Sequence, residues 1–262
     1  MTEIIAIANQ KGGVGKTTTA INLSACLGAQ NYRCLLIDLD PQGNCSRGIG
    51  IDSTALKRTL FDAMVGQVEV KKVIKKNVTN NVDLLPANLN LALVESTIIS
   101  SGNVGNNYNV LQNTIKGIID KYDFIIIDCP PSLGFLCFNA LTLATSTLIP
   151  VQCEYFAMEA VAQILATINS IRTTTNPNLE ILGFLLTMYS RTRLNSEISA
   201  EVAQTFKEKT LGTPIPRNIT LAECSAIGVP INTYKPRAIG TMAYSSLARE
   251  VIDYVNKKEN NK

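Results

Sequence analysis

Residues 9–23, with the sequence NQKGGVGKTTTAINL, combine three glycines, two lysines and three consecutive threonines. Glycines allow consecutive backbone N–H groups to turn toward one anion, and a helix that begins at such a turn adds its partial positive charge. We therefore expect a loop that binds the phosphates of a nucleotide. The expected contacts are Gly12, Gly13, Val14, Gly15, Lys16, Thr17 and Thr18.

Three side chains at the end of this loop have separate expected roles. The Lys16 ammonium group reaches the β- and γ-phosphates, the Thr17 hydroxyl binds Mg²⁺, and Thr18 reaches the α-phosphate. The usual pattern G-x-x-x-x-G-K-[ST] has a glycine where this chain has Gln10, so the motif is a variant. The competing interpretation is a glycine-rich turn with two incidental lysines, which the strand–loop–helix context disfavours.

Two further segments place carboxylates at the ends of apolar runs. IIIDCPPSLG (125–134) contains a run closed by Asp128, an arrangement in which the carboxylate holds Mg²⁺ directly or through water. LLIDLDPQGN (35–44) puts Asp38 and Asp40 two residues apart at a strand end, so both could approach the same Mg²⁺ and water. Ordinary caps at a strand end are the competing interpretation of these two aspartates.

These motifs require elements that bring them to one edge of a sheet. Near-continuous apolar strands with helices between them indicate a mostly parallel sheet covered on both faces, with ligands at the carboxyl ends of its strands. We expect a doubly wound α/β fold, in a single domain over 1–262 that carries the phosphate-binding loop, with a polar tail at 254–262. The expected strands are 3–8, 33–40, 82–87, 123–130, 146–152 and 180–189. The expected helices are 16–30, 54–65, 88–100, 109–121, 135–144, 155–173, 195–210 and 241–256, and 100–109 is an expected surface loop.

The composition excludes several classes of site and location. The chain has no histidine, which removes histidine-based acid–base chemistry and histidine ligation of zinc. Its seven cysteines form no C-x-x-C pair, so we interpret most of them as core residues in a reducing compartment. The first residues carry no basic leader, and no stretch approaches the roughly 18 apolar residues of a membrane span. We expect a cytoplasmic protein.

The charge of the chain is unevenly distributed. The net charge is +3, and from residue 188 onward 11 basic residues face 7 acidic ones, which gives +4 for that portion. This excess allows a polyanionic partner on the C-terminal portion. The last expected helix also carries an apolar stripe, which we assign to the core; a membrane-binding face is the alternative.

The segment from Lys11 to Thr17 reads K-G-G-V-G-K-T. It resembles the signature of the deviant Walker A group of P-loop ATPases. The resemblance implies that the chain binds ATP and Mg²⁺, that Lys11 crosses a dimer interface to contact the partner's ATP, and that Asp40 positions the attacking water. A cation supplied in trans stabilises the charge that develops on the γ-phosphate oxygens. A solvated loop residue is the competing interpretation of Lys11. The expected catalytic residues are Lys11, Lys16 and Asp40, and the expected metal ligands are Thr17, Asp40 and Asp128.

Further motifs extend the resemblance over nearly the whole chain: DLDPQGN, DCPPSLG, PVQCEYFAMEAV, LLTMYSRT and IPRN. Together they are similar to the ParA/Soj branch, the partition ATPases of bacterial chromosomes and plasmids. The resemblance implies a homodimer that forms with ATP, binds double-stranded DNA without sequence preference and associates with the nucleoid. It also implies a centromere-binding partner of the ParB/Spo0J type that stimulates hydrolysis, which is slow without it.

The same resemblance assigns residues in the C-terminal third of the chain. Pro216 and Asn218, in the segment PIPRNIT (214–220), line the adenine pocket, with an ordinary turn as the alternative. Thr220 and Val229 stand where chromosomal relatives often carry basic residues, so the DNA surface is arranged differently here. VEVKKVIKK (68–76) is a possible substitute, although a solvated charged face is the favoured interpretation. The expected DNA contacts are Arg191, Arg193, Arg217, Lys235 and Arg237.

Three alternatives share the phosphate loop. A MinD-like membrane ATPase requires a C-terminal amphipathic anchor, whereas the tail here is polar. An iron–sulfur carrier or nitrogenase-reductase-like protein requires cysteines that bridge a dimer, for which Cys129 is the candidate. An ATPase that positions protein cargo could have the same core sequence.

Overall fold

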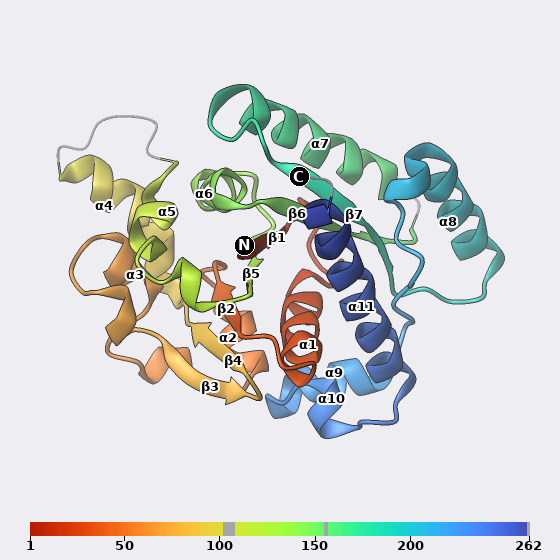
Figure 1. The fold of residues 1–262 in the computed structure, drawn as a ribbon, viewed down its shortest axis with the longest axis horizontal. Helices are drawn as coiled ribbons and strands as arrows, with labels where there is room; N and C mark the ends of the chain where they lie inside the picture. Colours follow the sequence, from red (N-terminus) through yellow and green to blue (C-terminus); the bar gives the residue numbers. More distant parts are fainter. Residues whose placement is uncertain (102–107, 155–156, 261–262) are drawn as a thin grey trace.

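A seven-stranded sheet forms the centre of the molecule, with helices on both of its faces (Figure 1). The computed structural model describes residues 1–101, 108–154 and 157–260. The strand order is β3-β4-β2-β5-β1-β6-β7, with β3 antiparallel to β4 and the other neighbours parallel. The strands are β1 (Glu3–Ile7), β2 (Cys34–Asp38), β3 (Lys75–Thr79), β4 (Val82–Leu85), β5 (Phe124–Asp128), β6 (Ser146–Gln152) and β7 (Glu180–Thr187). The doubly wound, mostly parallel fold is confirmed.

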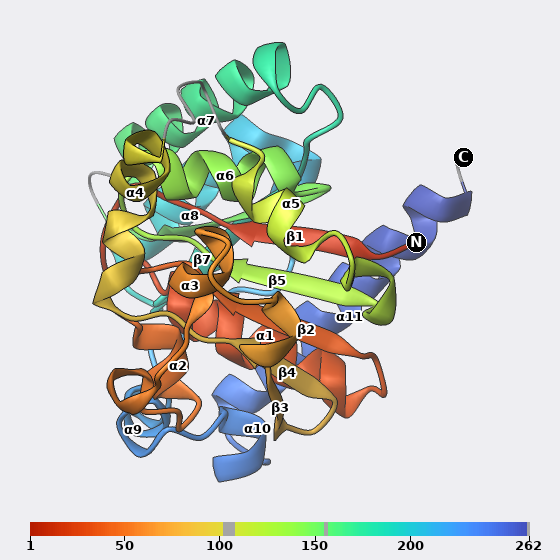
Figure 2. The ribbon, with the colours of Figure 1, turned by 90° about the vertical axis from the view of Figure 1, so that its left-hand side faces the viewer.

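The helices divide into two layers because alternate side chains of each strand point to opposite faces of the sheet. In β1, Ile4 and Ala6 contact the core beneath one layer, while Ile5 and Ile7 contact the core beneath the other. Residues of α3 to α8 line the first core, and residues of α1, α2, α9, α10 and α11 line the second. Figure 2 shows α6 and α7 on one side of the sheet and α2, α9 and α10 on the other.

The helix bounds are α1 (Lys16–Ala29), α2 (Asn44–Gly48), α3 (Leu60–Met64), α4 (Val94–Ser100), α5 (Val110–Ile115), α6 (Phe135–Leu143), α7 (Ala157–Thr174), α8 (Arg193–Phe206), α9 (Ile219–Ile227), α10 (Ile231–Tyr234) and α11 (Ile239–Asn260). Short 3₁₀ turns cover Ser53–Ala55, Val70–Lys72, Leu89–Leu93, Ile119–Lys121 and Lys207–Lys209. No helix in the described ranges combines the length and apolar character that crossing a membrane demands.

The six expected strands are present, but several expected helices are shorter than the sequence pattern suggests. The helix expected over 54–65 is a 3₁₀ turn followed by the five-residue α3, and the helix expected over 109–121 ends with α5 at Ile115. The sequence analysis did not predict β3, α2 or α9, which are short elements that tertiary contacts stabilise rather than long periodic ones. Most of the loop expected over 100–109, and the start of the helix expected over 155–173, lie outside the described residues.

Helix α11 continues through Asn260, beyond the end expected at residue 256, so the polar segment expected over 254–262 is helical as far as the structure describes it. Polar residues of this last segment have partners on the sheet: the Tyr254 hydroxyl donates to the Glu180 carboxylate, and the Lys258 ammonium group lies 3.5 Å from Glu3 Oε2. These contacts extend the helix beyond its apolar stripe. The stripe itself faces the core, as expected, with Tyr244 and Leu247 buried.

Candidate active site

The loop between β1 and α1 has the backbone geometry that an anion requires. Gly13 and Gly15 adopt φ values of +76° and +88°, which L side chains rarely take. A Cβ atom added to Gly12 or Gly13 would meet no atom within 4 Å, so this backbone faces open space. Helix α1 begins at Lys16, and no side chain caps its first turn. The first N–H groups of α1 are therefore left for a ligand.

The Lys16 side chain is buried at the start of this helix. Its Nζ donates to the Lys11 carbonyl at 3.1 Å. Burial lowers the pKa of Lys16, while the neighbouring Asp128 carboxylate acts in the opposite direction. A buried ammonium group that gives one hydrogen bond to a neutral carbonyl has two more protons to donate, which suits a phosphate oxygen.

Asp128 lies at the end of β5, directly beside Asp38 at the end of β2. Its side chain is fully buried, and both carboxylate oxygens lack a hydrogen-bond partner. Burial raises the pKa of Asp128 well above its ordinary value, and Asp38 adds to the effect, while Thr17 and Lys16 oppose it. A buried carboxylate without a partner is costly, which is the property expected of a group that binds a cation.

Asp38 and Asp40 have different surroundings, although they are only two positions apart in the sequence. Asp38 is fully buried, and its Oδ2 accepts from the Ser46 N–H at 2.7 Å and from the Ser46 hydroxyl at 2.6 Å. Burial raises the pKa of Asp38 to about 7, and the bonds from Ser46 oppose the shift. Asp38 Oδ1 accepts from the Asp40 N–H at 3.3 Å. Asp38 therefore holds the segment that carries Asp40, and it is Asp40 that lines the hollow described next.

A hollow of about 970 Å³ lies above the carboxyl ends of the strands. Its lining combines residues of the phosphate loop, Asp40 and the two prolines after Asp128. Residues that line this hollow but are not among the expected site residues include Gln42, Arg47, Met188 and Ser225. Arg47 carried a usable signal, because it is a cation seven residues after Asp40; Ser225 carried none, because α9 was not expected.

A second hollow of about 380 Å³ shares Gly15, Thr18, Met188 and Ser225 with the first. Pro216 and Asn218 line this second hollow. The Asn218 side-chain oxygen accepts from the Thr220 N–H at 2.8 Å and thereby caps α9. Its amide group remains a donor on the same side chain. Together the two hollows have the division expected for phosphates on one side and a base on the other.

Lys11 lies beside the loop and forms an ion pair with Glu154, with 2.8 Å between Nζ and Oε2. The Lys11 N–H donates to Asn9 Oδ1 at 3.0 Å, and its carbonyl accepts from Lys16. The backbone of Lys11 is therefore fixed on both sides, while its side chain ends in a partly exposed ion pair.

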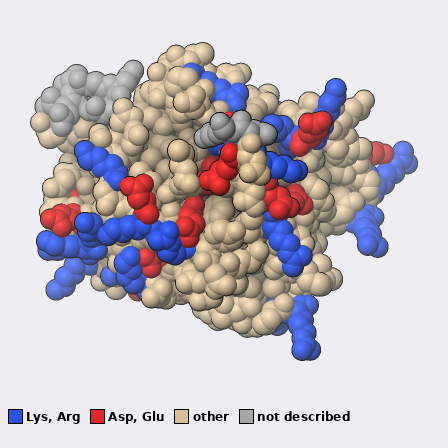
Figure 3. All heavy atoms as spheres, in the orientation of Figure 1, with Lys and Arg blue, Asp and Glu red and all other residues tan. Residues whose placement is uncertain are grey.

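The expected DNA contacts separate into groups. Arg191 and Arg217 line one hollow of about 750 Å³, and the Arg217 N–H donates to the Tyr189 carbonyl at 3.0 Å. Lys235 and Arg237 line another hollow, of about 500 Å³, and Lys235 pairs with Glu223. Arg193 is exposed at the start of α8 and pairs with Glu197. On the face shown in Figure 3, basic and acidic side chains are interspersed over the left-hand part, where Figure 1 places α3, α5 and β3.

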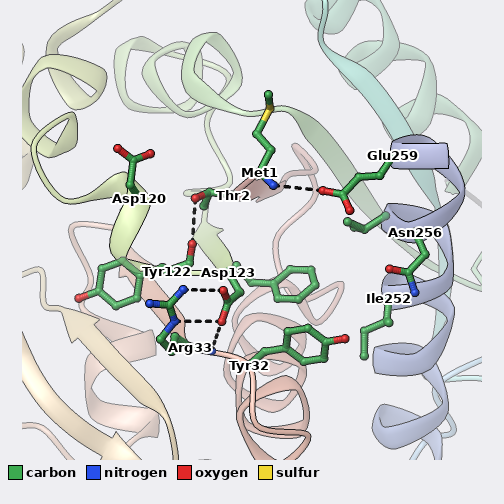
Figure 4. Close-up of a pocket in the computed structure, with 12 residues that line it drawn as sticks. Met1, Thr2, Tyr32, Arg33, Asp120, Tyr122, Asp123, Ile252, Asn256 and Glu259 are labelled. Carbon is green, nitrogen blue, oxygen red and sulfur yellow. Dashed lines mark hydrogen bonds and ion pairs between the residues drawn. The ribbon is translucent and has the colours of Figure 1, made fainter. Parts of the chain in front are cut away.

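A further hollow, of about 360 Å³, lies at the amino ends of the strands, opposite the phosphate loop (Figure 4). Four of its charged groups form two ion pairs: the Met1 ammonium group lies 3.1 Å from Glu259, and Arg33 lies 2.7 Å from Asp123. The remaining acidic residue, Asp120, is exposed to solvent, so this hollow differs from the other edge, where charged groups are buried.

The residues present at the carboxyl edge fit a nucleotide and a divalent cation. The open backbone of the loop and the buried Lys16 suit phosphate, and the unpartnered oxygens of Asp128 suit Mg²⁺. In the described part of the chain, no three His, Cys, Asp or Glu side chains are grouped so as to hold a metal ion alone. A cation here would therefore take further oxygens from phosphate and from the Thr17 hydroxyl, as Mg²⁺ commonly does.

Known proteins share this sequence and fold. The family model AAA_31, described as an AAA domain, matches residues 2–181. The sporulation initiation inhibitor protein Soj of Bacillus subtilis is 44% identical over 252 residues, which are 96% of this chain and 98% of that protein. The chromosome partitioning protein ParA of Caulobacter vibrioides is 43% identical over 252 residues, which are 95% of this chain and 93% of that protein.

Two solved structures extend the comparison to the ligands. Cobyrinic acid a,c-diamide synthase from Mycobacterium smegmatis, with bound ADP and magnesium, matches with a TM-score of 0.85 and 35% identity over 98% of this chain and 96% of its own. The cell division ATPase MinD of Pyrococcus furiosus matches with a TM-score of 0.81 and 30% identity over 97% of this chain and 99% of its own. ATP and Mg²⁺ are the cofactors of this chain, which belongs to the ParA/Soj family of chromosome partitioning ATPases.

Proposed function

We propose that this chain dimerises when it binds ATP, that the dimer binds double-stranded DNA without sequence preference, and that this cycle partitions a chromosome or plasmid. A ParB-type centromere-binding protein stimulates hydrolysis and releases the DNA. The relatives named Soj and ParA support partition as the role. The observation that carries the proposal is the position of Lys11, whose side chain is free to leave its ion pair.

The Lys11–Glu154 pair is a weak constraint on the Lys11 side chain. The exposed fractions of the two side chains are 28% and 48%, and exposed ion pairs contribute about 0–1 kcal/mol. The backbone on either side is held by Asn9 and Lys16. Lys11 can therefore turn its ammonium group toward a phosphate of the nucleotide bound to another protomer without rearranging the loop. A lysine that acts across a dimer interface requires this freedom.

Each group of the site has a task in hydrolysis under this proposal. Mg²⁺, when bound, neutralises part of the charge of the phosphates. Lys16 and the N–H groups of the loop bind phosphate oxygens, and Asp40 orients the water. Because one protomer supplies its own Lys16 but not the Lys11 of a second copy, its isolated site is incomplete, and hydrolysis without dimer and partner is slow.

The exposed guanidinium groups support DNA as the polyanion. Arg191 and Arg217 lie on one hollow, at the carboxyl-terminal side of β7, and a dimer presents them twice. Contacts of this kind go to the phosphate backbone and carry no sequence information, so binding should weaken with salt.

The test is binding of a random-sequence duplex with MgATP, with MgADP or without nucleotide, over a series of salt concentrations. We expect the duplex to bind in the presence of MgATP but not with MgADP or without nucleotide. The Lys16→Ala and Lys11→Ala variants should lose this binding. The Arg191→Ala/Arg217→Ala variant should lower the slope of log K against log salt by about 1 for each lost phosphate contact. Lys116→Ala/Lys121→Ala, which removes two exposed lysines between α5 and β5, is the matched control. Equal binding in all nucleotide states would contradict the proposal.

A membrane-associated role is the second candidate, because the MinD structure is a close match in fold. The burial of the apolar stripe of α11 speaks against it, since Tyr244, Leu247 and Val251 pack in the core and are not available to lipid. Sedimentation with anionic liposomes and MgATP distinguishes the two: DNA binding without liposome binding supports partition, and the reverse supports the membrane role.

A further inference from the structure

Two glycines that are far apart in the sequence meet beside the nucleotide site. Gly50 follows α2 with a φ of +86°, and Gly228 follows α9 with a φ of +78°. A Cβ atom on Gly228 would lie 2.7 Å from the Cα of Gly50, and a Cβ on Gly50 would lie 2.9 Å from the Gly228 carbonyl oxygen. The two helices therefore touch through backbone at these glycines, beyond their carboxyl ends, and Figure 2 shows α9 beside α2.

The two helices contribute differently to the site: α9 lines both hollows, whereas α2 lines the phosphate hollow. Helix α9 begins at its cap Asn218, and its residues Ala222 and Ser225 line the hollow assigned to the base. Helix α2 follows the segment that carries Asp40, and its residues Arg47 and Gly48 line the phosphate hollow. The contact between Gly50 and Gly228 thus joins α9, which lines the base hollow, to α2, which follows the segment that carries Asp40, the residue proposed to orient the water.

The helices are also joined above the glycines. Ile49, next to α2, packs in the same core as Leu221 and Cys224 of α9. At its other end α2 is fixed to the sheet, because Ser46 donates twice to Asp38, which in turn accepts from the Asp40 N–H. A displacement of α9 is therefore transmitted through α2 to the Asp40 segment.

Contact through backbone makes this transmission stiff. A pair of side chains could absorb a small displacement by changing rotamer, whereas two glycine backbones in contact have no such freedom, and packed interiors transmit strain. We infer that Gly50 and Gly228 are positioning residues that couple occupation of the base hollow to the placement of α2 and Asp40. The inference goes beyond the proposed function, because it requires nucleotide binding but neither a dimer nor DNA.

The test compares two ligands by hydrogen exchange of the backbone amides of residues 44–51. MgADP fills both hollows, while inorganic pyrophosphate with Mg²⁺ fills the phosphate loop without a base. In the wild-type chain, saturating MgADP should slow exchange in this segment about fivefold or more beyond pyrophosphate, which is the lower end of typical coupling between sites. Equal protection by the two ligands would overturn the inference.

Three variants assign the effect to the contact. Gly228→Ala and Gly50→Ala should each lose the extra protection given by MgADP. Gly66→Ala is the matched control, because Gly66 has the same φ of +78° as Gly228 but no atom within 4 Å of an added Cβ, so it shares the backbone strain without the contact. Gly50→Ala changes a residue outside α9 and outside the lining of the base hollow, whereas Gly228→Ala changes the C-cap of α9, so ADP affinity measured by calorimetry should stay closer to that of the wild type in Gly50→Ala than in Gly228→Ala. Extra protection that persists in Gly50→Ala would overturn the inference, whatever the outcome for DNA binding.

Discussion

Asp128 and Asp83 are buried carboxylates near opposite edges of the same sheet, and their surroundings differ completely. Asp83, at the amino end of β4, accepts from the Lys76 ammonium group at 2.5 Å, from the Tyr122 hydroxyl at 2.8 Å and from the Asn77 N–H at 2.9 Å. Asp128, at the carboxyl end of β5, accepts no hydrogen bond with either oxygen. At the amino edge, groups of the protein itself donate hydrogen bonds to the buried carboxylate. At the carboxyl edge, the buried carboxylate has no partner within the protein and is left for a ligand.

This difference separates charges that stabilise the fold from charges that serve a ligand. A buried polar group that the protein itself satisfies contributes to stability, whereas one left without a partner is tolerated where a ligand repays its desolvation. The hollow at the amino edge contains two ion pairs, whereas the buried Lys16 lines the hollow at the carboxyl edge and the unpartnered Asp128 carboxylate is fully buried near Lys16. Hollow volume does not make this distinction; the state of the charged groups does.

Lys16→Ala is expected to have the largest effect. It removes the buried cation that faces the phosphates, and loss of one partner from a buried charge pair costs about 3–5 kcal/mol, or at least about 100-fold in ATP affinity. Isothermal calorimetry with ATP and Mg²⁺ measures the change. Lys76→Ala, which removes a lysine from the amino edge, should leave the affinity for ATP unaltered. A comparable loss of ATP affinity in both variants would contradict the functional difference between the two edges.

Asp83→Asn should lower stability without altering the nucleotide site. The variant weakens the bonds from Lys76 and Tyr122 and keeps an oxygen for the Asn77 N–H, so we expect a cost of about 2 kcal/mol in the free energy of unfolding. Urea unfolding monitored by circular dichroism measures this value. ATP affinity is the control, and it should match that of the wild type.

Lys11→Ala should have the smallest effect on stability and a specific effect on assembly. Its ion pair with Glu154 is partly exposed, so the free energy of unfolding should change by less than about 1 kcal/mol. Light scattering with MgATP should nevertheless show loss of the dimer. A dimer that forms normally in Lys11→Ala would remove Lys11 from the proposed interface.

The sequence predicts the parts of the site that lie in continuous motifs. The phosphate loop, Asp40 and Asp128 can be identified because each follows an apolar strand at a fixed spacing, and parallel strands bring such ends to one edge. The apolar character of β1, β2 and β5 likewise predicts a sheet buried on both faces.

The rest of the site depends on contacts between distant segments. Asp38 and Asp40 look equivalent in the sequence, and only the hydrogen bonds from Ser46 show that Asp38 holds the segment while Asp40 faces the hollow. The meeting of Gly50 and Gly228 involves residues 178 positions apart, which no local pattern encodes. Short elements such as β3 and α9 also escape prediction, because packing rather than periodicity stabilises them.

Thermal unfolding of Asp128→Asn with and without ligand tests the central claim most directly. Because Asp128 is fully buried and both of its oxygens lack a partner, burial raises its pKa and the ligand-free fold disfavours its charge, so the ligand-free variant should unfold at the same temperature as the wild type or a few degrees higher. Adding Mg²⁺ to the ADP complex should raise the unfolding temperature of the wild type and leave that of the variant unchanged. Asp83→Asn should behave in the opposite way, with a lower unfolding temperature and an intact response to Mg²⁺. If Asp128→Asn instead lowered stability as much as Asp83→Asn and kept its response to Mg²⁺, Asp128 would be a structural group and the assignment of this edge to the metal would be wrong.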